Sequence, residues 1–379
     1  MVTIAVTAEG ADEPRIAVSP ETVKKLTGLG AKVRVEAGAG ARSRFSDDAL
    51  KAAGAEIAAT AAETLSGADI LLKVRRPSAD EIKQLKPAAL VGALLDPFDK
   101  PGLEPIVATG ASLFSMEFVP RITRAQSMDV LSSQANLAGY KAVVDAASAF
   151  GQALPMMMTA AGTVPAAKLF IMGVGVAGLQ AIATARRLGA IVSATDVRPA
   201  TKEQVASLGA KFIAVEDEEF KQAQTAAGYA KPMSAEYQAK QAELIASHIK
   251  NQDIVITTAL IPGRPAPKLV SAAMLASMKP GSVIVDLAAE RGGNVEGTVP
   301  GETVEVSGVK IVGPLNLAGT VPVNASSLYA KNLLAFLDLF FDKKDKSFNV
   351  NWDDEIVRGT LIAKDGKIVH PNLASQPAA

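Results

Sequence analysis

Residues 169–178 read Leu-Phe-Ile-Met-Gly-Val-Gly-Val-Ala-Gly, and this stretch decides the fold. The apolar run predicts a buried strand, the glycines a tight loop, and residues 176–188 a helix. Gly173 permits the turn, Gly175 lets a pyrophosphate approach the backbone, and Gly178 allows close packing of helix on strand. Because a helix N-terminus attracts phosphate, we predict a dinucleotide-binding βαβ unit. The alternative is a glycine turn that packs the unit without binding a ligand.

Asp196 follows the next predicted strand, residues 191–195, and lies 18 residues beyond Gly178. An acidic side chain at this place can accept hydrogen bonds from the adenosine ribose hydroxyls. It would also repel the 2′-phosphate of NADP, so the pattern favours NAD. Arg198 keeps NADP open as an alternative, because an arginine beside the ribose can bind that phosphate.

The same alternation of strand and helix continues along the 379 residues, a length typical of two or three domains. The predicted strands are 2–6, 32–36, 69–74, 89–95 and 112–117 in a first block, then 169–172, 191–195, 211–215, 253–257, 281–287 and 309–312. Alternating strands and helices predict parallel sheets. Long helices are predicted at 132–154 and 324–341.

We therefore predict an α/β protein of two Rossmann-like, doubly wound parallel-sheet domains joined by long helices. The N-terminal domain would be discontinuous, residues 1–131 plus 324–379. Residues 132–323 would form the NAD(H)-binding domain, and the cofactor would lie in a cleft.

The composition excludes several kinds of protein. Lys plus Arg and Asp plus Glu are both 39, so no net charge draws the chain to nucleic acid. With no Cys and two His, thiolate chemistry is excluded and a metal site is not expected. The uncharged stretch 146–167 contains Gly151 and Pro155, which indicate a helix end and loop instead of a membrane span. No export signal is visible, so any chemistry must depend on carboxylates, amides, Arg, Lys or a cofactor.

A second polar patch lies at residues 120–134, between the two blocks. Its two guanidiniums, amide, carboxylate and hydroxyls could hold a nicotinamide carboxamide and a pyrophosphate. The same residues also suit a capped helix start, with Asp129 or Ser132 as N-cap and the arginines on the surface. From the residues alone both interpretations stay open.

Residues 121–141, RITRAQSMDVLSSQANLAGYK, resemble the signature of the NAD(H)-binding component of proton-translocating nicotinamide nucleotide transhydrogenases. The resemblance covers essentially the whole chain. It includes residues 15–20, 155–163, 253–263 and 285–288 as well as the glycine loop.

The resemblance implies a catalytic loop of Arg121, Gln126 and Asp129. Gln126 would reach toward the nicotinamide and the partner nucleotide, Arg121 would contact the dinucleotide, and Asp129 would hold Arg121. Ser132 would lie near the carboxamide. The other implied cofactor-binding residues are Ile122, Thr123, Arg124, Ser127, Met128, Gly173, Gly175, Val176, Ala177, Gly178, Asp196, Val197, Arg198, Gly228, Tyr229, Gln241 and Leu260.

Gln241 and Leu260 rest on the resemblance alone, since the pattern by itself predicts a helix-surface amide and a strand-end apolar residue. Residues 216–232 interrupt the alternation of strand and helix with acidic residues, Gly228, Tyr229 and Pro232, and predict a mobile loop or lid. By resemblance, Tyr229 on this lid would close over bound nucleotide.

The implied function is hydride transfer between NADH and NADP⁺, with NADP(H) held by a partner domain. The implied setting is a cytoplasmic homodimer, peripheral on the inner membrane through the membrane subunits of the transhydrogenase. Because no membrane span is predicted after residue 342, we expect proton translocation in those subunits or in an extension. Bringing two nicotinamide C4 atoms within about 3–3.5 Å is largely a matter of positioning, which suits a chain with so little histidine.

Two alternatives are an alanine-dehydrogenase-like oxidoreductase and a non-catalytic NAD sensor. Alanine dehydrogenases resemble the chain in fold, and Lys73 resembles their substrate-binding lysine. Their histidine, however, has no counterpart in residues 90–96, and Glu290 stands where they carry an aspartate.

Four single features receive structural predictions. We expect His248 to interact with the C-terminal dipole of its helix and Asp286 to cap a loop. The run Met156 to Met158, with Met172, is predicted to pack in the interior, and Trp352 to anchor the tail onto the first domain.

Overall fold

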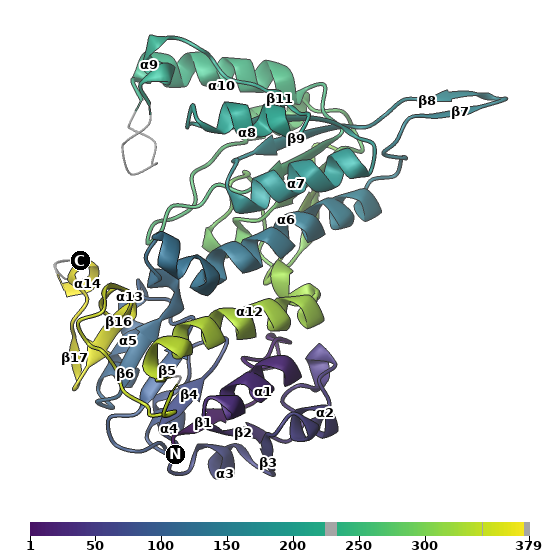
Figure 1. Cartoon of the computed structure of the whole chain (residues 1–379). Helices are drawn as coiled ribbons and strands as arrows, with labels where there is room; N and C mark the ends of the chain where they lie inside the picture. Colours follow the sequence, from purple (N-terminus) through teal and green to yellow (C-terminus); the bar gives the residue numbers. More distant parts are fainter. Residues whose placement is uncertain (224–232, 343, 375–379) are drawn as a thin grey trace. The chain divides into compact units, whose positions relative to one another are not determined.

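The computed structural model describes residues 1–223, 233–342 and 344–374. The chain divides into two compact units: unit 1 is Met1–Gln134 with Ala318–Ala379, and unit 2 is Ala135–Leu317. Each unit is built around its own sheet (Figure 1).

Unit 1 contains an eight-stranded sheet of order β17-β16-β6-β5-β4-β1-β2-β3. Its strands are β1 (Thr3–Val6), β2 (Lys32–Glu36), β3 (Glu56–Ala58), β4 (Ile70–Leu72), β5 (Leu90–Ala93), β6 (Ser112–Ser115), β16 (Leu361–Lys364) and β17 (Lys367–Ile368). The strands from β6 to β3 are parallel, whereas β16 and β17 are antiparallel.

The helices of unit 1 begin at sequence-encoded caps. Ser19 accepts a hydrogen bond from the Thr22 amide, and Pro20 occupies the first turn. The helices are α1 (Pro20–Gly28), α2 (Asp47–Ala52), α3 (Ala61–Leu65), α4 (Ala79–Ile82), α5 (Lys100–Val107), α12 (Pro322–Leu337), α13 (Glu355–Thr360) and α14 (Pro371–Ala374). Short 3₁₀ turns include η3 (Thr123–Met128).

Unit 2 contains a seven-stranded sheet of order β11-β10-β9-β12-β13-β15-β14, with only β14 antiparallel. Its strands are β9 (Lys168–Met172), β10 (Ile191–Thr195), β11 (Lys211–Phe212), β12 (Ile254–Thr257), β13 (Val283–Asp286), β14 (Thr303–Val306) and β15 (Val309–Val312). The helices are α6 (Val130–Ala149), which begins in unit 1, and α7 (Val176–Arg187), α8 (Thr201–Ser207), α9 (Glu218–Lys221), α10 (Ala235–Ile249) and α11 (Ala272–Ser277).

Both sheets are buried on their two faces. On β9, Leu169 and Ile171 belong to one hydrophobic cluster, and Phe170 and Met172 to another. On β1, Ile4 and Ala5 are divided in the same way. Since successive side chains of a strand point to opposite faces, helices cover both sides of each sheet. The predicted fold class is confirmed, with the correction that antiparallel edge strands make both sheets mixed.

The two long helices differ from their predicted ends. The helix predicted at 132–154 spans Val130–Ala149, and the carbonyl of Ala149 accepts a hydrogen bond from Lys310 Nζ at 2.9 Å. The helix predicted at 324–341 spans Pro322–Leu337 and continues as a 3₁₀ turn. Helix ends depend on such long-range caps, which the local pattern does not contain.

The prediction that Met156 to Met158 pack in the interior is wrong. Residues 157–159 and 162–164 form a two-stranded hairpin, β7 (Met157–Thr159) and β8 (Gly162–Val164), that projects from unit 2 (Figure 1). The exposed fractions are 56% for Met156, 43% for Met157 and 79% for Met158. Met172, in contrast, is buried as predicted.

Two other structural predictions are confirmed. Asp286 is buried and accepts hydrogen bonds from Thr257 Oγ1, Thr298 Oγ1 and the amide of Val295, so it caps its loop. The Trp352 ring stacks on Phe114 of β6 and lies under Lys364 Nζ, which anchors the tail to unit 1.

His248 does lie in the last turn of α10, yet the predicted charge–dipole interaction is not what its surroundings favour. Its Nε2 shares a hydrogen bond of 2.8 Å with Ser193 Oγ, and its ring packs edge-on against Phe170. Burial lowers the pKa of His248, which favours the neutral ring.

Candidate functional site

The glycine loop joins β9 to α7 at the carboxyl end of the sheet of unit 2 (Figure 1). Gly173 has φ +104°, and a Cβ there would lie 2.5 Å from Thr258 Oγ1. A Cβ on Gly178 would lie 1.9 Å from the carbonyl oxygen of Gly173. Both positions therefore need glycine for the fold itself.

Gly175 differs from its two neighbours. Its φ is −83°, and a Cβ built there would meet no atom within 4 Å. No side chain caps the N-terminus of α7, whose first amides have no partner within the helix. The loop thus presents an open space beside unpaired helix amides, as an anion site requires.

Helix α6 packs against the first turn of α7, next to this loop. The sequence pattern did not predict this contact. A Cβ on Gly139 would lie 2.1 Å from the carbonyl oxygen of Ala177. Only glycine at 139 lets α6 approach the first turn of α7 so closely. An unexplained glycine within a helical pattern was the only available signal.

Asp196 follows β10, and its carboxylate holds both the loop and Arg198. Its Oδ2 accepts from the Val174 amide at 2.7 Å, and its Oδ1 accepts from Arg198 Nε at 2.8 Å. Arg198 Nη2 also donates to the Val174 carbonyl. The hydrogen bond to Asp196 raises the pKa of Arg198. The positive charge of Arg198 is thus already paired with a carboxylate.

Gln241 is not the free surface amide that its pattern suggests. From α10, its Nε2 donates to Thr195 Oγ1 at 3.2 Å and its Oε1 accepts from the Val215 amide at 2.8 Å. The side chain therefore ties α10 to the carboxyl end of β10.

Apolar side chains follow three of the strand ends at this edge of unit 2. Val176 is 37% exposed, Val197 53% and Leu260 54%. Because large apolar side chains seldom gather on a surface without a partner, this edge offers contact area for a flat organic ring. Ala177, the remaining predicted residue of the α7 start, is partly exposed.

The Arg121–Asp129 segment lies in unit 1 and centres on the 3₁₀ turn η3. Arg121, Thr123, Gln126 and Ser127 are exposed, and Ile122 is partly buried. Met128 is 4% exposed, in the hydrophobic core of the unit. Gln126 therefore stands on a turn that the core anchors.

The end of this segment matches the capped helix start. Asp129 Oδ1 accepts from the Ser132 amide at 2.9 Å, and Asp129 Oδ2 accepts from Ser132 Oγ at 2.6 Å. Arg124 forms a bidentate pair with Asp354, at 2.7 and 2.9 Å. Since Gln126 stays exposed between these contacts, the two interpretations of the patch do not exclude each other.

Lys73 lies in a buried ionic cluster at the carboxyl ends of β1 and β4 in unit 1. Its Nζ donates to Glu81 Oε1 at 2.9 Å, to Thr7 Oγ1 and to the Ala8 carbonyl, and lies 4.0 Å from Glu9. Burial raises the pKa of Glu9, and the charge of Lys73 only partly offsets this. The ammonium has its hydrogen-bond partners within the chain.

Arg15 completes the cluster in the same way. Its Nε and Nη2 donate to Glu13 at 2.7 and 2.6 Å, and its Nη1 donates to Gln134 at 2.8 Å. Burial favours the protonated acid of Glu13, but the hydrogen bonds and charges of Arg15 and Arg75 outweigh it and lower the pKa of Glu13 to about 2.

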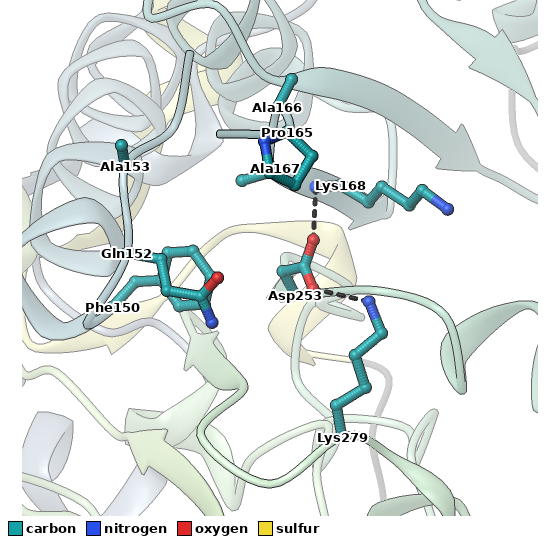
Figure 2. Close-up of a pocket in the computed structure, with 9 residues that line it drawn as sticks. All are labelled: Phe150, Gln152, Ala153, Pro165, Ala166, Ala167, Lys168, Asp253 and Lys279. Atoms are coloured by element: carbon teal, nitrogen blue, oxygen red, sulfur yellow. Dashed lines mark hydrogen bonds and ion pairs between the residues drawn. The ribbon is translucent and has the colours of Figure 1, made fainter. Parts of the chain in front are cut away.

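A cavity of about 330 Å³ lies at the other edge of the unit 2 sheet (Figure 2). Lys168 and Asp253, at the amino ends of β9 and β12, line it together with Phe150, Pro165 and Lys279. Asp253 accepts from the Lys168 amide and from Lys279 Nζ, both at 2.7 Å. No predicted site residue lines this cavity.

Gly228 and Tyr229 lie outside the residues that the structure describes, so the predicted lid contacts stay predictions. Among the described residues, the structure contains no cluster of three His, Asp or Glu side chains suited to a metal ion. Within that same part of the chain, none of the helices has the length and apolarity needed to cross a membrane.

Comparison with known proteins places both halves of the chain in one family. Residues 5–138 match the family model "Alanine dehydrogenase/PNT, N-terminal domain", and residues 142–371 match "Alanine dehydrogenase/PNT, C-terminal domain". The first part of the NAD(P) transhydrogenase subunit alpha of Rhodospirillum rubrum is 55% identical over 97% of each chain.

Two solved structures are similar over nearly their whole length. The transhydrogenase from Sinorhizobium meliloti is 57% identical with a TM-score of 0.88, covering 97% of this chain and 100% of that one. An L-alanine dehydrogenase is 25% identical with a TM-score of 0.80, covering 98% of both chains. Sequence identity and structural similarity therefore agree: the chain belongs to the alanine dehydrogenase/PNT family and, within it, to the NAD(P) transhydrogenase alpha subunits.

Proposed function

We propose that this chain binds NAD(H) and positions it for hydride exchange with NADP(H) held by a partner domain of a proton-translocating transhydrogenase. The observation that carries the proposal is the open space at Gly175, beside the uncapped N-terminus of α7. A phosphate there would accept hydrogen bonds from amides that have no partner within the helix.

The surroundings of the loop suit the rest of an adenine dinucleotide. Asp196 can accept hydrogen bonds from ribose hydroxyls if they share it with Arg198. Val197 and Leu260 offer exposed apolar surface for the adenine ring. Because Asp196 already pairs with Arg198, a 2′-phosphate would compete with a carboxylate for the same guanidinium, which favours NAD(H) over NADP(H).

The loop Arg121–Asp129 is proposed to act at the nicotinamide end. Gln126 is exposed on an anchored turn, so its amide can orient a carboxamide or a neighbouring nucleotide. Asp129 holds the start of α6 through Ser132, and in the proposal it also restrains Arg121. The dihydronicotinamide supplies the hydride when bound. These residues need only hold it in place, because direct hydride transfer between two nicotinamides requires no proton transfer by a side chain.

The ionic cluster of unit 1 argues against amino-acid oxidation. An alanine-dehydrogenase-like reaction would need a cation free to bind a substrate carboxylate and a general base beside it. Lys73 and Arg15 are instead paired with Glu81, Glu9 and Glu13. Residues 90–96 supply no histidine as a base.

The decisive experiment mixes the chain with an NADP(H)-binding transhydrogenase domain and follows reduction of an NAD⁺ analogue by NADPH. We expect rapid hydride exchange in the mixture and none in either protein alone. Binding without exchange in the mixture would identify a non-catalytic NAD sensor. Ammonia-dependent oxidation of NADH by pyruvate, with the chain alone, would identify the dehydrogenase.

Replacing Asp196 by alanine should reduce the preference for NADH over NADPH about tenfold, or ~1.4 kcal/mol. The change removes the acceptor for ribose hydroxyls and frees Arg198 for a 2′-phosphate. Both affinities should fall, since the Val174 amide also loses its partner. Fluorescence titration with each nucleotide measures the ratio.

The matched control is the double substitution Asp196→Ala with Arg198→Met. It should bind NADPH more weakly than Asp196→Ala alone, because the freed guanidinium is gone. An unchanged NADH/NADPH ratio in Asp196→Ala would refute the specificity role of this carboxylate.

We also propose that the chain forms a homodimer and attaches to the cytoplasmic face of the inner membrane through its partner subunits. The hairpin β7–β8 supports this proposal, because its exposed surface suits contact with a second copy of the chain. All its residues except Val164 are exposed, and an isolated two-stranded hairpin is only marginally stable in water. Exposed Leu188 and Ile191 adjoin its base, where Gly189 packs on Pro155.

Substituting Met157 by aspartate should weaken the dimer about 100-fold without unfolding the chain. In a two-fold dimer every substitution counts twice, and covering the part of Met157 that is still exposed contributes about 1.4 kcal/mol per copy, or about tenfold each. Sedimentation velocity measures the effect. Val369→Asp, at a site 47% exposed in unit 1, is the control and should leave the oligomeric state unchanged. A monomeric wild-type chain would contradict the dimer.

A further inference from the structure

The turn that carries Gln126 is hydrogen-bonded to a buried side chain of unit 1 that lies far away in sequence. Asn332 of α12 is 7% exposed. Its Nδ2 donates to the carbonyl of Ser127 at 2.8 Å, and its Oδ1 accepts from Ser133 Oγ at 2.7 Å. One amide thus joins the residue after Gln126 to the first turns of α6.

The orientation of this amide is fixed by its two partners. The Ser127 carbonyl can only accept, so the nitrogen of Asn332 must face it. The Ser133 hydroxyl donates to the oxygen of Asn332 and lies 3.1 Å from the Val130 carbonyl. A flipped amide would place two acceptors against each other at Ser127.

The hydrogen bonds continue from Ser133 into the ionic cluster. Gln134 Nε2 donates to Ser133 Oγ at 3.2 Å and to the Ala325 carbonyl at 3.1 Å. Gln134 Oε1 accepts from Arg15 Nη1, and Arg15 is paired with Glu13. Arg15 and Gln134 are both buried, so a hydrogen-bond network runs through the interior to the Gln126 turn. Its members are Glu13, Arg15, Gln134, Ser133 and Asn332.

We propose that Asn332 is a positioning residue for Gln126, and that the buried hydrogen-bond network from Arg15 sets the orientation of the Asn332 amide. The inference rests on the proposed function and adds to it a residue outside the Arg121–Asp129 segment. The ionic cluster then contributes to hydride exchange indirectly, because it holds Asn332 in place and Asn332 holds the turn that carries the Gln126 amide. Without the bond from Asn332, the Ser127 carbonyl is free to shift and Gln126 shifts with it.

Asn332→Asp tests the proposal, because the substitution is isosteric and its effect can be reversed by pH. The introduced carboxylate can still accept from Ser133, but its other oxygen would face the Ser127 carbonyl and repel it. When protonated, the acid can donate to that carbonyl and restore the bond. Burial raises the pKa of such a group, so its protonation can be followed between about pH 8.5 and about pH 6.

In the full chain mixed with the NADP(H)-binding domain, we expect kcat for hydride exchange to fall about tenfold at the upper pH. The Kd for NADH should change less than about twofold. The ratio of variant to wild-type kcat should rise toward one as the pH falls. The wild-type partners of Asn332, the Ser127 carbonyl and the Ser133 hydroxyl, do not titrate in this pH range. Glu13, at the far end of the hydrogen-bond network, does not titrate there either, because the pKa of its carboxyl is lowered to about 2.

A second readout needs neither nucleotide nor partner. Hydrogen exchange followed by mass spectrometry should show faster exchange of residues 120–130 in Asn332→Asp at the upper pH, and no change in unit 2. Asn324→Asp is the matched control: it adds the same charge to an exposed position of the same helix and should leave both readouts unchanged.

Three outcomes would overturn the inference. They are a pH-independent ratio, an equal loss of kcat and NADH affinity, and unchanged exchange in residues 120–130. If Asn332→Asp does not fold, Ser133→Ala replaces it: removing the hydroxyl that orients the amide should lower kcat about threefold with an unchanged Kd for NADH. If the wild-type mixture itself shows no hydride exchange, the proposed function fails, whereas the exchange readout still tests the contact.

Discussion

Replacing Gly175 by alanine is expected to weaken NADH binding about 100-fold, or ~2.7 kcal/mol, and to leave folding intact. The backbone at 175 is in an extended conformation that any residue adopts, and a Cβ there meets no protein atom within 4 Å. The methyl group would instead fill the space that the proposal gives to the pyrophosphate. Fluorescence titration with NADH and the thermal unfolding midpoint measure the two effects separately.

Two other glycines of unit 2 serve as controls. Gly151→Ala also meets open space, away from the loop, and should change neither quantity. Gly178→Ala places a Cβ 1.9 Å from the Gly173 carbonyl oxygen and should destabilise the unit by about 1–3 kcal/mol. Wild-type NADH affinity in Gly175→Ala would show that the loop does not hold the pyrophosphate.

Shortening Gln126 to asparagine is expected to slow hydride exchange about 100-fold while the Kd for NADH changes less than about threefold. The amide is kept but withdrawn by one methylene, and a displacement on the order of 1 Å can cost that much in rate. Because Gln126 is exposed on an anchored turn, the substitution should not affect folding. Stopped-flow measurement with the NADP(H)-binding domain gives the rate, and titration gives the affinity.

The matched control is Gln84→Asn, an equal shortening of another exposed glutamine of unit 1 that lies outside the site. It should leave both quantities at their wild-type values. Equal losses of rate and affinity in Gln126→Asn would mean that Gln126 contributes to binding and has no separate positioning role.

Local patterns predict the glycine loop well because the strand, the turn and the helix that form it are neighbours in sequence. A strand, a turn and a helix start follow each other within residues 168–178, and Gly178 packs against the backbone of Gly173 close along the chain. Asp196 is predicted from the same βαβ motif, since it directly follows the next strand. The family resemblance adds the Gln126 segment, for which the residues alone leave two interpretations open.

Other predictions fail where the environment of a side chain is set far away in sequence. Met156 to Met158 are apolar and expected inside, but they belong to a hairpin that projects from unit 2. Apolar composition predicts burial without saying against which chain. Gln241 has the pattern of a surface amide, and only the packing of α10 brings it to Thr195 and Val215.

The sequence by itself determined the fold class, the family and the position of the glycine loop, because these depend on periodicity and on motifs of contiguous residues. The tertiary structure alone decided that Gly139 supports the loop and that Asn332 holds the turn of Gln126. It also decided that Lys73 and Arg15 form ion pairs with glutamates of the same chain. These contacts join residues up to 205 positions apart, as Asn332 is from Ser127. A single sequence does not show which residues such contacts bring together, because the contacts arise from packing and not from local propensity.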